Sequence, residues 1–164
     1  MNHKILKLFL ECFLVVCLSA CGKIEFSKNR DNNQLTVTKI HDTVVLNQTT
    51  KEALVKQFGQ PDQEVTDPSK TETLFRQDNE TEGGILDWLD DETDFYKTRK
   101  SVKHDYDYSD GWDYDNCYIY QDKNLGVEYV RFYIKDGLVG EYYFGDITNK
   151  SIAKKDKYLR QIID

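Results

Sequence analysis

The stretch VEYVRFYIKDGLVGEYYF, residues 127–144, holds the clearest structural pattern in the chain. Residues 127–134 and 138–144 are rich in aromatic and β-branched side chains, which favour strands, and Lys135-Asp136-Gly137 supplies turn residues between them. Residues 114–121 have the same composition and lead into the first run through residues 122–126. These patterns predict three consecutive antiparallel strands.

Side-chain placement favours a three-residue turn between the last two strands. A two-residue Asp136-Gly137 loop would set Glu141 opposite Phe132, on an apolar face. A three-residue loop, with Gly137 in the left-handed region, avoids this conflict. The predicted pairs are therefore Ile134 with Leu138, Val130 with Tyr142, and Arg131 with Glu141.

This register gives the predicted sheet two different faces. The apolar face, which we expect helices to cover, carries Val130, Phe132, Ile134, Leu138, Tyr142 and Phe144, joined by Cys117 and Ile119. The other face carries five tyrosines around the Arg131–Glu141 pair: Tyr118, Tyr120, Tyr129, Tyr133 and Tyr143. Tyrosine is amphipathic and common at interfaces, so this face is a candidate surface for a partner protein. Alternatively, the acidic segment 87–115 covers these rings and forms a second small core with them.

The region before the three strands contains a short helix with both ends encoded. Thr49 and Glu52 form a capping box, apolar residues follow at helical spacing as far as Phe58, and Gly59 and Pro61 stop the helix. Three further elements are predicted by pattern: a strand at residues 35–40, a strand at 71–77, and an amphipathic closing helix at 151–163. The fold class is therefore α+β, an antiparallel sheet with about two short helices on one face.

An acidic stretch separates the two halves of the chain. Residues 87–115 contain ten acidic residues and four Lys or Arg, a composition that fits either an irregular arm or a long hairpin. The alternation from Asp105 to Asp110 suggests a calcium loop. However, an EF-hand counted from Asp105 needs glycine and glutamate where this chain has Asp110 and Asn116. A solvated acidic loop is the default interpretation, and an irregular calcium site is the alternative.

Residues 1–20 have the layout of a secretory signal. Lys4 and Lys7 give a positive start, and the apolar run 9–18 is too short to span a membrane. The run ends in Leu18-Ser19-Ala20-Cys21, which resembles the lipobox of bacterial lipoproteins. The resemblance implies cleavage before Cys21 and lipid on its sulfur, which would hold the protein on the outer face of the cytoplasmic membrane. The alternative is an ordinary secretory peptide.

The predicted organisation is a signal peptide at 1–20, a flexible tether at 21–34 and a single domain at 35–164. Removal of the leader would leave 20 basic and 28 acidic residues, a net charge of −8. This excess of acid argues against a nucleic-acid partner, which needs a basic patch. Apart from Cys21, Cys117 would be the one remaining cysteine, so no intrachain disulfide is expected, and we expect Cys117 to be a buried small hydrophobe.

The order of these elements carries a second resemblance. A "T-x-x-E … G-x-P" helix end at Thr49 to Pro61, followed by the hairpin around Lys135-Asp136-Gly137, resembles small lipoproteins of the SmpA/OmlA type and the β-lactamase-inhibitor-protein-like fold. The resemblance covers residues 43–62 and 127–145, and the segment 78–113 departs from it as an insertion. It implies two helices on an antiparallel sheet and a role in protein binding or envelope assembly. The chain is also similar to uncharacterised single-domain lipoproteins of low-GC Gram-positive bacteria.

The sequence shows no motif of catalysis or metal binding. It lacks a phosphate-binding loop, a nucleophile elbow and a Ser-His-Asp order, and neither His41 nor His104 has further ligands at metal spacing. We therefore predict no catalytic residue, no cofactor and no metal, and a non-catalytic lipoprotein that binds another protein of the cell envelope. A glycan- or solute-binding lipoprotein that stacks ligands on Trp88, Trp112 and the tyrosines is the alternative, and an envelope hydrolase using carboxylates of the acidic stretch is the least favoured.

Overall fold

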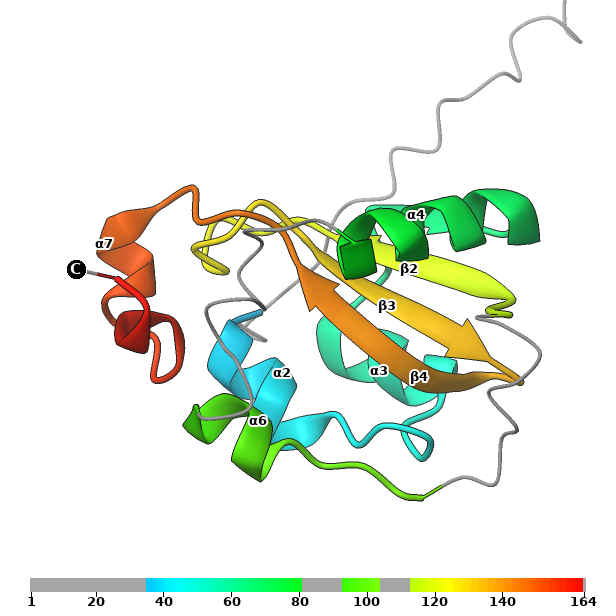
Figure 1. The fold of residues 1–164 in the computed structure, drawn as a ribbon, viewed down its shortest axis with the longest axis horizontal. Helices are drawn as coiled ribbons and strands as arrows, with labels where there is room; N and C mark the ends of the chain where they lie inside the picture. Colours follow the sequence, from blue (N-terminus) through cyan, green and yellow to red (C-terminus); the bar gives the residue numbers. More distant parts are fainter. Residues whose placement is uncertain (1–34, 81–92, 104–112, 164) are drawn as a thin grey trace, which may run out of the picture.

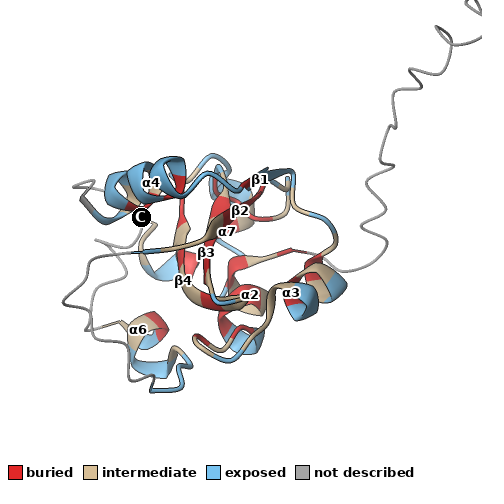
Figure 2. Cartoon of the chain, turned by 90° about the vertical axis from the view of Figure 1, so that its right-hand side faces the viewer, coloured by how far each residue is buried: buried red, intermediate tan, exposed pale blue. Residues whose placement is uncertain are grey.

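The computed structural model describes residues 35–80, 93–103 and 113–163, which form an antiparallel sheet with helices on both faces (Figures 1 and 2). The strands lie in the order β1-β2-β3-β4 and span Gln63–Val65, Asn116–Tyr120, Val130–Lys135 and Leu138–Phe144. The predicted α+β class with an antiparallel sheet is confirmed. The helices are more numerous than the two expected, and one of them lies on the opposite face from the others.

The turn between β3 and β4 is shorter than predicted. Lys135 pairs with Leu138, so the turn contains only Asp136 and Gly137. Both residues have positive φ, 50° and 76°, which is the conformation of a type I′ turn. The predicted three-residue loop is therefore wrong.

A bulge in β4 resolves the conflict that argued against the short turn. Ile134 pairs with Val139 and Tyr133 pairs with Glu141, so Gly140 is an extra residue between them. The bulge moves Glu141 away from Phe132, and the predicted pairing of Arg131 with Glu141 is also wrong because Arg131 lies opposite Tyr143. Glycine is required at this position for a second reason: a Cβ on Gly140 would lie 2.8 Å from Cε1 of Tyr114.

The register of β2 against β3 decides which β2 side chains enter each face. Tyr118 lies opposite Phe132, and Cys117 lies opposite Tyr133. The side chains of β3 and of most of β4 point to the faces predicted for them. The side chains of β2 point to the opposite faces from those predicted. The main core on one face includes Tyr118, Tyr120, Val130, Phe132, Ile134, Val139, Tyr142 and Phe144. The second core, on the other face, consists of Val65, Phe75, Cys117, Ile119 and Tyr133, with Leu74, Tyr114, Tyr129 and Tyr143 packed against it.

Residues 35–40, predicted as a strand, lead into helix α2, Val37–Thr43. Thr36 caps this helix, because its Oγ1 accepts a hydrogen bond from the backbone N–H of Lys39 at 3.1 Å. Helical spacing explains the assignment, since the buried residues recur at i, i+3, i+4 and i+7: Val37, Ile40, His41 and Val44.

The helix predicted before Gly59 is confirmed as α3, Lys51–Phe58. Gly59 ends it with φ of 81°, as its position after the last apolar residue indicated. The cap lies one residue later than predicted, because Oγ1 of Thr50 accepts from the N–H of Ala53 at 3.1 Å. The hydroxyl of Thr49 instead closes the preceding turn.

Residues 71–77, also predicted as a strand, lie within the longest described helix, α4, Pro68–Glu80. Asp67 starts the helix: its Oδ1 accepts hydrogen bonds from the backbone N–H groups of Ser69 (3.1 Å) and Lys70 (3.4 Å). Pro68 at the first helical position needs no such bond. The side of the helix facing the sheet carries Thr71, Leu74, Phe75 and Asp78, again at helical spacing.

The C-terminal segment is not the single helix predicted at 151–163. It contains a short helix α7, Lys150–Ala153, and a 3₁₀ turn η2, Leu159–Gln161. Between them the buried Asp156 accepts hydrogen bonds on Oδ1 from the backbone N–H groups of Tyr158 (3.0 Å) and Leu159 (3.3 Å). The apolar residues of the segment nevertheless face the domain, since Leu159 is buried and Ile162 and Ile163 pack against the main core. Helix α6, Asp94–Thr98, completes the covering of this face and contributes the buried Phe95.

The edge of β4 near the turn is covered by the chain before α3. The carbonyl of Val139 accepts from the N–H of Asn47 at 2.7 Å, and the N–H of Val139 donates to the carbonyl of Thr49 at 2.8 Å. Leu46 in turn pairs with Ser101. These contacts satisfy backbone groups that an open edge would leave free for another chain.

Several predicted features lie outside the described residues. These are the leader, the tether, Cys21, Trp88, Trp112, His104 and the acidic alternation at 105–110. Within the described ranges, no helix has the length and apolar character needed to cross a bilayer.

Candidate functional site

The polar contact between α4 and the sheet centres on Asp78. Its Oδ1 accepts a hydrogen bond from the hydroxyl of Tyr129 at 3.1 Å and lies 2.6 Å from Nη1 of Arg131. Its Oδ2 accepts from the hydroxyl of Tyr133 at 2.6 Å. The side chain of Asp78 is 5% exposed and that of Arg131 is 15% exposed. One carboxylate thus joins the helix to three donors along an interior strand of the sheet.

Aromatic rings surround this contact. The ring of Phe75 lies 5.1 Å from that of Tyr133, 5.7 Å from that of Tyr143 and 5.0 Å from that of Tyr114, measured between centroids. The first two pairs are edge-to-face, an arrangement that aromatic rings favour. Arg131 adds a cation–π contact, with its guanidinium carbon 4.1 Å from the centroid of Tyr129. The interface is therefore both aromatic and charged.

Burial dominates the electrostatics of the interface. It raises the pKa of Asp78 above its usual value, while the Tyr133 hydroxyl and the charge of Arg131 act in the opposite direction. Burial also opposes the charge of Arg131, but the carboxylate of Asp78 outweighs it and the pKa of Arg131 is raised. The pKa of Tyr129 rises to about 12 through burial and the neighbouring carboxylate.

Cys117 lies in the same core and is buried, as predicted. Burial raises the pKa of its thiol to about 12, so the reactive thiolate is disfavoured at neutral pH. Together with the Asp78 contacts, this core fastens α4 to the sheet.

The five tyrosines predicted to share one face are divided between the two. Tyr118 and Tyr120 lie in the main core, and Tyr120 is fully buried with its hydroxyl bonded to the carbonyl of Gly59. Tyr129, Tyr133 and Tyr143 lie together under α4. Helix α4 covers this group, and Tyr114, at the end of the acidic stretch 87–115, packs against the same core. Residues 87–92 and 104–112 of that stretch lie outside the described residues, so the alternative that the stretch covers the tyrosines stays a prediction. Tyr133 is fully buried, so it cannot contact a partner directly.

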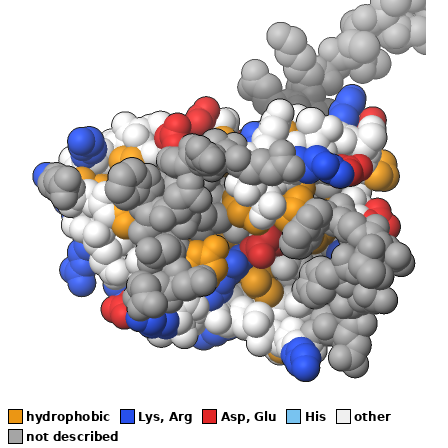
Figure 3. Space-filling model, viewed as in Figure 1, with side chains coloured by type: hydrophobic (Ala, Val, Ile, Leu, Met, Phe, Trp, Pro, Cys, Tyr) orange, Lys and Arg blue, Asp and Glu red, His pale blue; other side chains and the backbone are white. Residues whose placement is uncertain are grey.

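Tyr129 and Tyr143 are only half-buried and form a margin beside α4. The hydroxyl of Tyr143 donates to Oδ1 of Asn79 at 3.1 Å. Arg76 and Asn79 are exposed and lie on one side of the helix. We call Tyr129, Tyr143, Arg76 and Asn79 the α4 margin. In Figure 3, hydrophobic side chains, a class that includes tyrosine, reach the surface along the border between α4 and the sheet.

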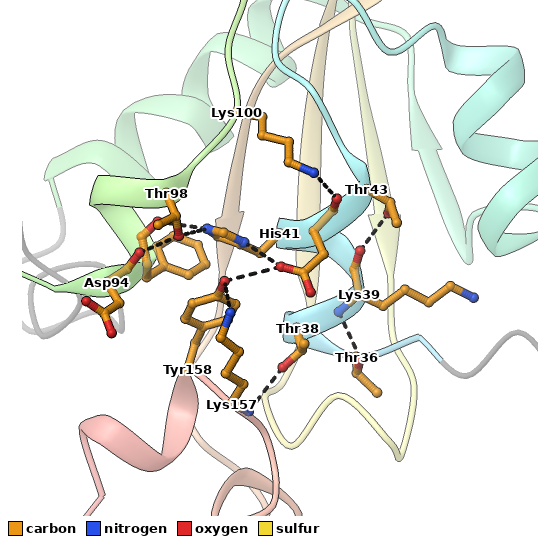
Figure 4. Close-up of polar contacts among 12 residues, drawn as sticks. Thr36, Thr38, Lys39, His41, Thr43, Asp94, Thr98, Lys100, Lys157 and Tyr158 are labelled. Atoms are coloured by element: carbon orange, nitrogen blue, oxygen red, sulfur yellow. Dashed lines mark hydrogen bonds and ion pairs between the residues drawn. The ribbon is translucent and has the colours of Figure 1, made fainter.

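A second polar cluster lies on the other face, around the buried His41 (Figure 4). Its Nε2 lies 2.8 Å from the carbonyl oxygen of Phe95, and its Nδ1 lies 3.0 Å from Oδ1 of Asp42. The same Oδ1 accepts from the hydroxyl of Tyr158 at 3.2 Å. Burial acts to raise the pKa of Asp42, but the hydrogen bonds from His41 and Tyr158 outweigh it and the pKa is lowered. The cluster links α2, α6 and the C-terminal segment.

Asp78 was not predicted as a site residue. Residues 71–77 were predicted to be a strand, and a strand there gives no reason for Asp78 to face the sheet. It does so because residues 68–80 form a helix. The signal that could have identified it is the Asp67-Pro68 helix start, with Thr71, Leu74, Phe75 and Asp78 at helical spacing. In the part of the chain that the structure describes, no three His, Cys, Asp or Glu side chains are grouped so that they could hold a metal ion.

Comparison of the chain with protein-family models, with curated proteins and with solved structures found no match in any of the three.

Proposed function

We propose that the chain is a lipoprotein anchored through Cys21 to the outer face of the cytoplasmic membrane, and that its domain binds another envelope protein without catalysis. The leader and the small residues before Cys21 support the anchoring. The structural role of Asp78 supports binding as the function in preference to catalysis. Its carboxylate accepts from three side chains and sits in a closed interface, where it holds two elements together. His41 and Cys117, the other reactive side chains considered, are buried as well.

The α4 margin is the surface that we propose for the partner. Tyr129 and Tyr143 are held in fixed positions by the packing of the second core, yet each keeps part of its ring exposed. Tyrosines ordered in this way lose little conformational entropy on binding and offer both apolar area and a hydroxyl. Arg76 is exposed on the same helix, where it pairs with Glu72, and arginine is enriched with tyrosine at interfaces.

The anchoring is tested by metabolic labelling with palmitate in a bacterial host. The natural chain should be labelled and should sediment with membranes, and Cys21→Ala should lose the label. Cys117→Ala is the matched control, and its labelling should equal that of the natural chain. Label retained by Cys21→Ala, or an intact leader on a cytoplasmic protein, would refute this part of the proposal.

The binding surface is tested by photo-cross-linking in cells. A photoreactive residue at Tyr143 should give a discrete cross-linked protein in the membrane fraction. The same residue at Lys56, which is exposed on α3 on the opposite face of the sheet, should not. Once the partner is purified, Tyr143→Ala should weaken its affinity at least tenfold, as expected for an interface aromatic. Equal cross-linking from both positions, or none from position 143, would count against the α4 margin.

A further inference from the structure

Residues 150–160 form a local exception to the negative charge of the chain. This segment, which we call the basic segment, contains five cationic side chains, Lys150, Lys154, Lys155, Lys157 and Arg160, and one acidic side chain, Asp156. The whole chain has a formal net charge of −7. The basic segment thus has a net charge of +4, opposite in sign to the net charge of the whole chain. Lys and Arg side chains are visible at the end of the molecule where α7 lies (Figures 1 and 3).

The positive charges of the basic segment are available to solvent. All five cationic side chains are exposed, whereas Asp156 is 8% exposed and turns inward to cap the next turn. Among the described residues, ion pairs form at Lys70, Arg76, Arg99, Arg131 and Lys135, and none forms within the basic segment. The Nζ of Lys157 donates to the hydroxyl of Tyr158 at 2.9 Å and lies 4.6 Å from the centroid of that ring.

The segment is held firmly on the domain and is not a loose tail. Asn149 caps α7, with its Oδ1 accepting from the N–H groups of Ser151 (3.1 Å) and Ile152 (3.3 Å). Ala153, Tyr158 and Leu159 are buried in the main core, which fixes the residues between them. The cations therefore form a surface of defined position, with less side-chain and backbone freedom to lose on binding.

The basic segment lies beside the point where the chain enters the domain. The N–H of Thr38 donates to Oδ2 of Asp156 at 2.9 Å, and the N–H of Lys157 donates to Oγ1 of Thr38 at 3.1 Å (Figure 4). Residues 22–37 separate Cys21 from Thr38. The flexible tether that the sequence predicts over most of this length would have a root-mean-square span of about 20 Å, so a lipid on Cys21 would keep the basic segment near the bilayer surface.

We propose that the basic segment binds the anionic headgroups of the membrane in which the lipid of Cys21 is inserted. This inference rests on the proposed anchoring and adds an electrostatic contact to it. Anionic bilayers attract clustered Lys and Arg within a Debye length, and one lipid chain is held more stably when a basic patch assists it. Helix α4 lies away from α7 in Figure 1, so a domain that contacts the membrane through α7 would leave α4 accessible to other proteins.

The test uses the chain from residue 21 with Cys21→Ser, so that no acyl chain contributes. Its sedimentation is measured with vesicles of phosphatidylcholine alone and with vesicles containing equal parts of phosphatidylglycerol. The test variant carries Lys150→Gln, Lys154→Gln, Lys155→Gln and Arg160→Gln, all at exposed positions. The control variant removes four exposed cations elsewhere, through Lys56→Gln, Lys70→Gln, Lys100→Gln and Lys103→Gln. Both variants are checked for unchanged thermal melting.

The unlipidated chain should bind only the vesicles with phosphatidylglycerol. Each basic residue near such a surface contributes about fivefold to the binding constant, so the test variant should bind about 100- to 1,000-fold more weakly. The control variant, whose net charge falls by the same amount, should bind as the parent does or only a few-fold more weakly, and binding should fall between about 0.1 M and about 1 M salt as the Debye length shortens from about 10 to about 3 Å. Equal loss in both variants, equal binding to both vesicle types, or no binding at all would overturn the proposal. None of these outcomes depends on acylation, which the palmitate experiment tests separately.

Discussion

The two faces of the sheet are closed in different ways. The main core packs apolar side chains from α2, α3, α6 and the C-terminal segment, and the rings of Phe58 and Phe132 lie 6.2 Å apart within it. The opposite face is covered by α4 alone among the described helices, and the contact includes the buried pair of Asp78 and Arg131. Apolar packing is non-directional and proportional to area, whereas a buried ion pair requires a particular partner in a particular place. The comparison indicates that the main core sets the stability of the domain and the Asp78 contact sets the position of α4.

The largest expected effect tests the main core. Phe132→Ala removes a fully buried ring that contacts Phe58, Tyr120 and Tyr142, and should lower the free energy of unfolding by about 4 kcal/mol. Urea denaturation followed by circular dichroism measures it. The matched change, Phe75→Ala, should release α4 first, so that hydrogen exchange accelerates in Pro68–Glu80 while β3 stays protected. Uniform loss of protection in both variants would mean that the two faces unfold as one unit.

The next effect tests the ion pair. Asp78→Ala leaves Arg131 buried without its carboxylate and should lower the free energy of unfolding by about 3 kcal/mol. Adding Arg131→Met removes the stranded charge, so the double variant should recover most of that loss. The double-mutant cycle is measured by urea denaturation. A double variant that is as unstable as the sum of the two single changes would show that the pair is not coupled.

The smallest effect compares one hydroxyl on each face. Tyr133→Phe deletes the hydroxyl that donates to Asp78, a hydrogen bond to a charged group worth about 1.5 kcal/mol. Tyr142→Phe deletes a buried hydroxyl that lies beside the guanidinium of Arg99 without a hydrogen bond of good geometry, so it should cost at most about 0.5 kcal/mol. Thermal melting of the two variants side by side gives the difference. Equal destabilisation would contradict the assignment of directional contacts to the α4 face.

Local sequence was sufficient to predict an element where composition and capping favoured the same secondary structure. The three C-terminal strands, helix α3 and the stop at Gly59 follow from composition and capping, and the structure confirms each of them. The two wrong strands, 35–40 and 71–77, are rich in threonine, whose β-branched side chain favours strands. Helix starts at Thr36 and Asp67 and a buried stripe on each helix outweighed that preference.

The candidate site was predictable only in part, because its register depends on contacts between distant segments. Alternation showed that β2 has two sides, but only its pairing with β3 decided that Tyr118 and Tyr120 enter the main core. The bulge at Gly140 likewise depends on a neighbouring ring, that of Tyr114.

Sequence alone determined the α+β class, the hairpin strands and the short capped helix, because each is encoded by neighbouring residues through propensity and spacing. The tertiary structure decided which tyrosines are covered, since Asp78 meets Arg131 and Tyr133 across more than fifty residues of chain. It also decided that the basic segment lies beside Thr38, more than one hundred residues earlier. Such contacts depend on how the elements pack, and no local pattern records them.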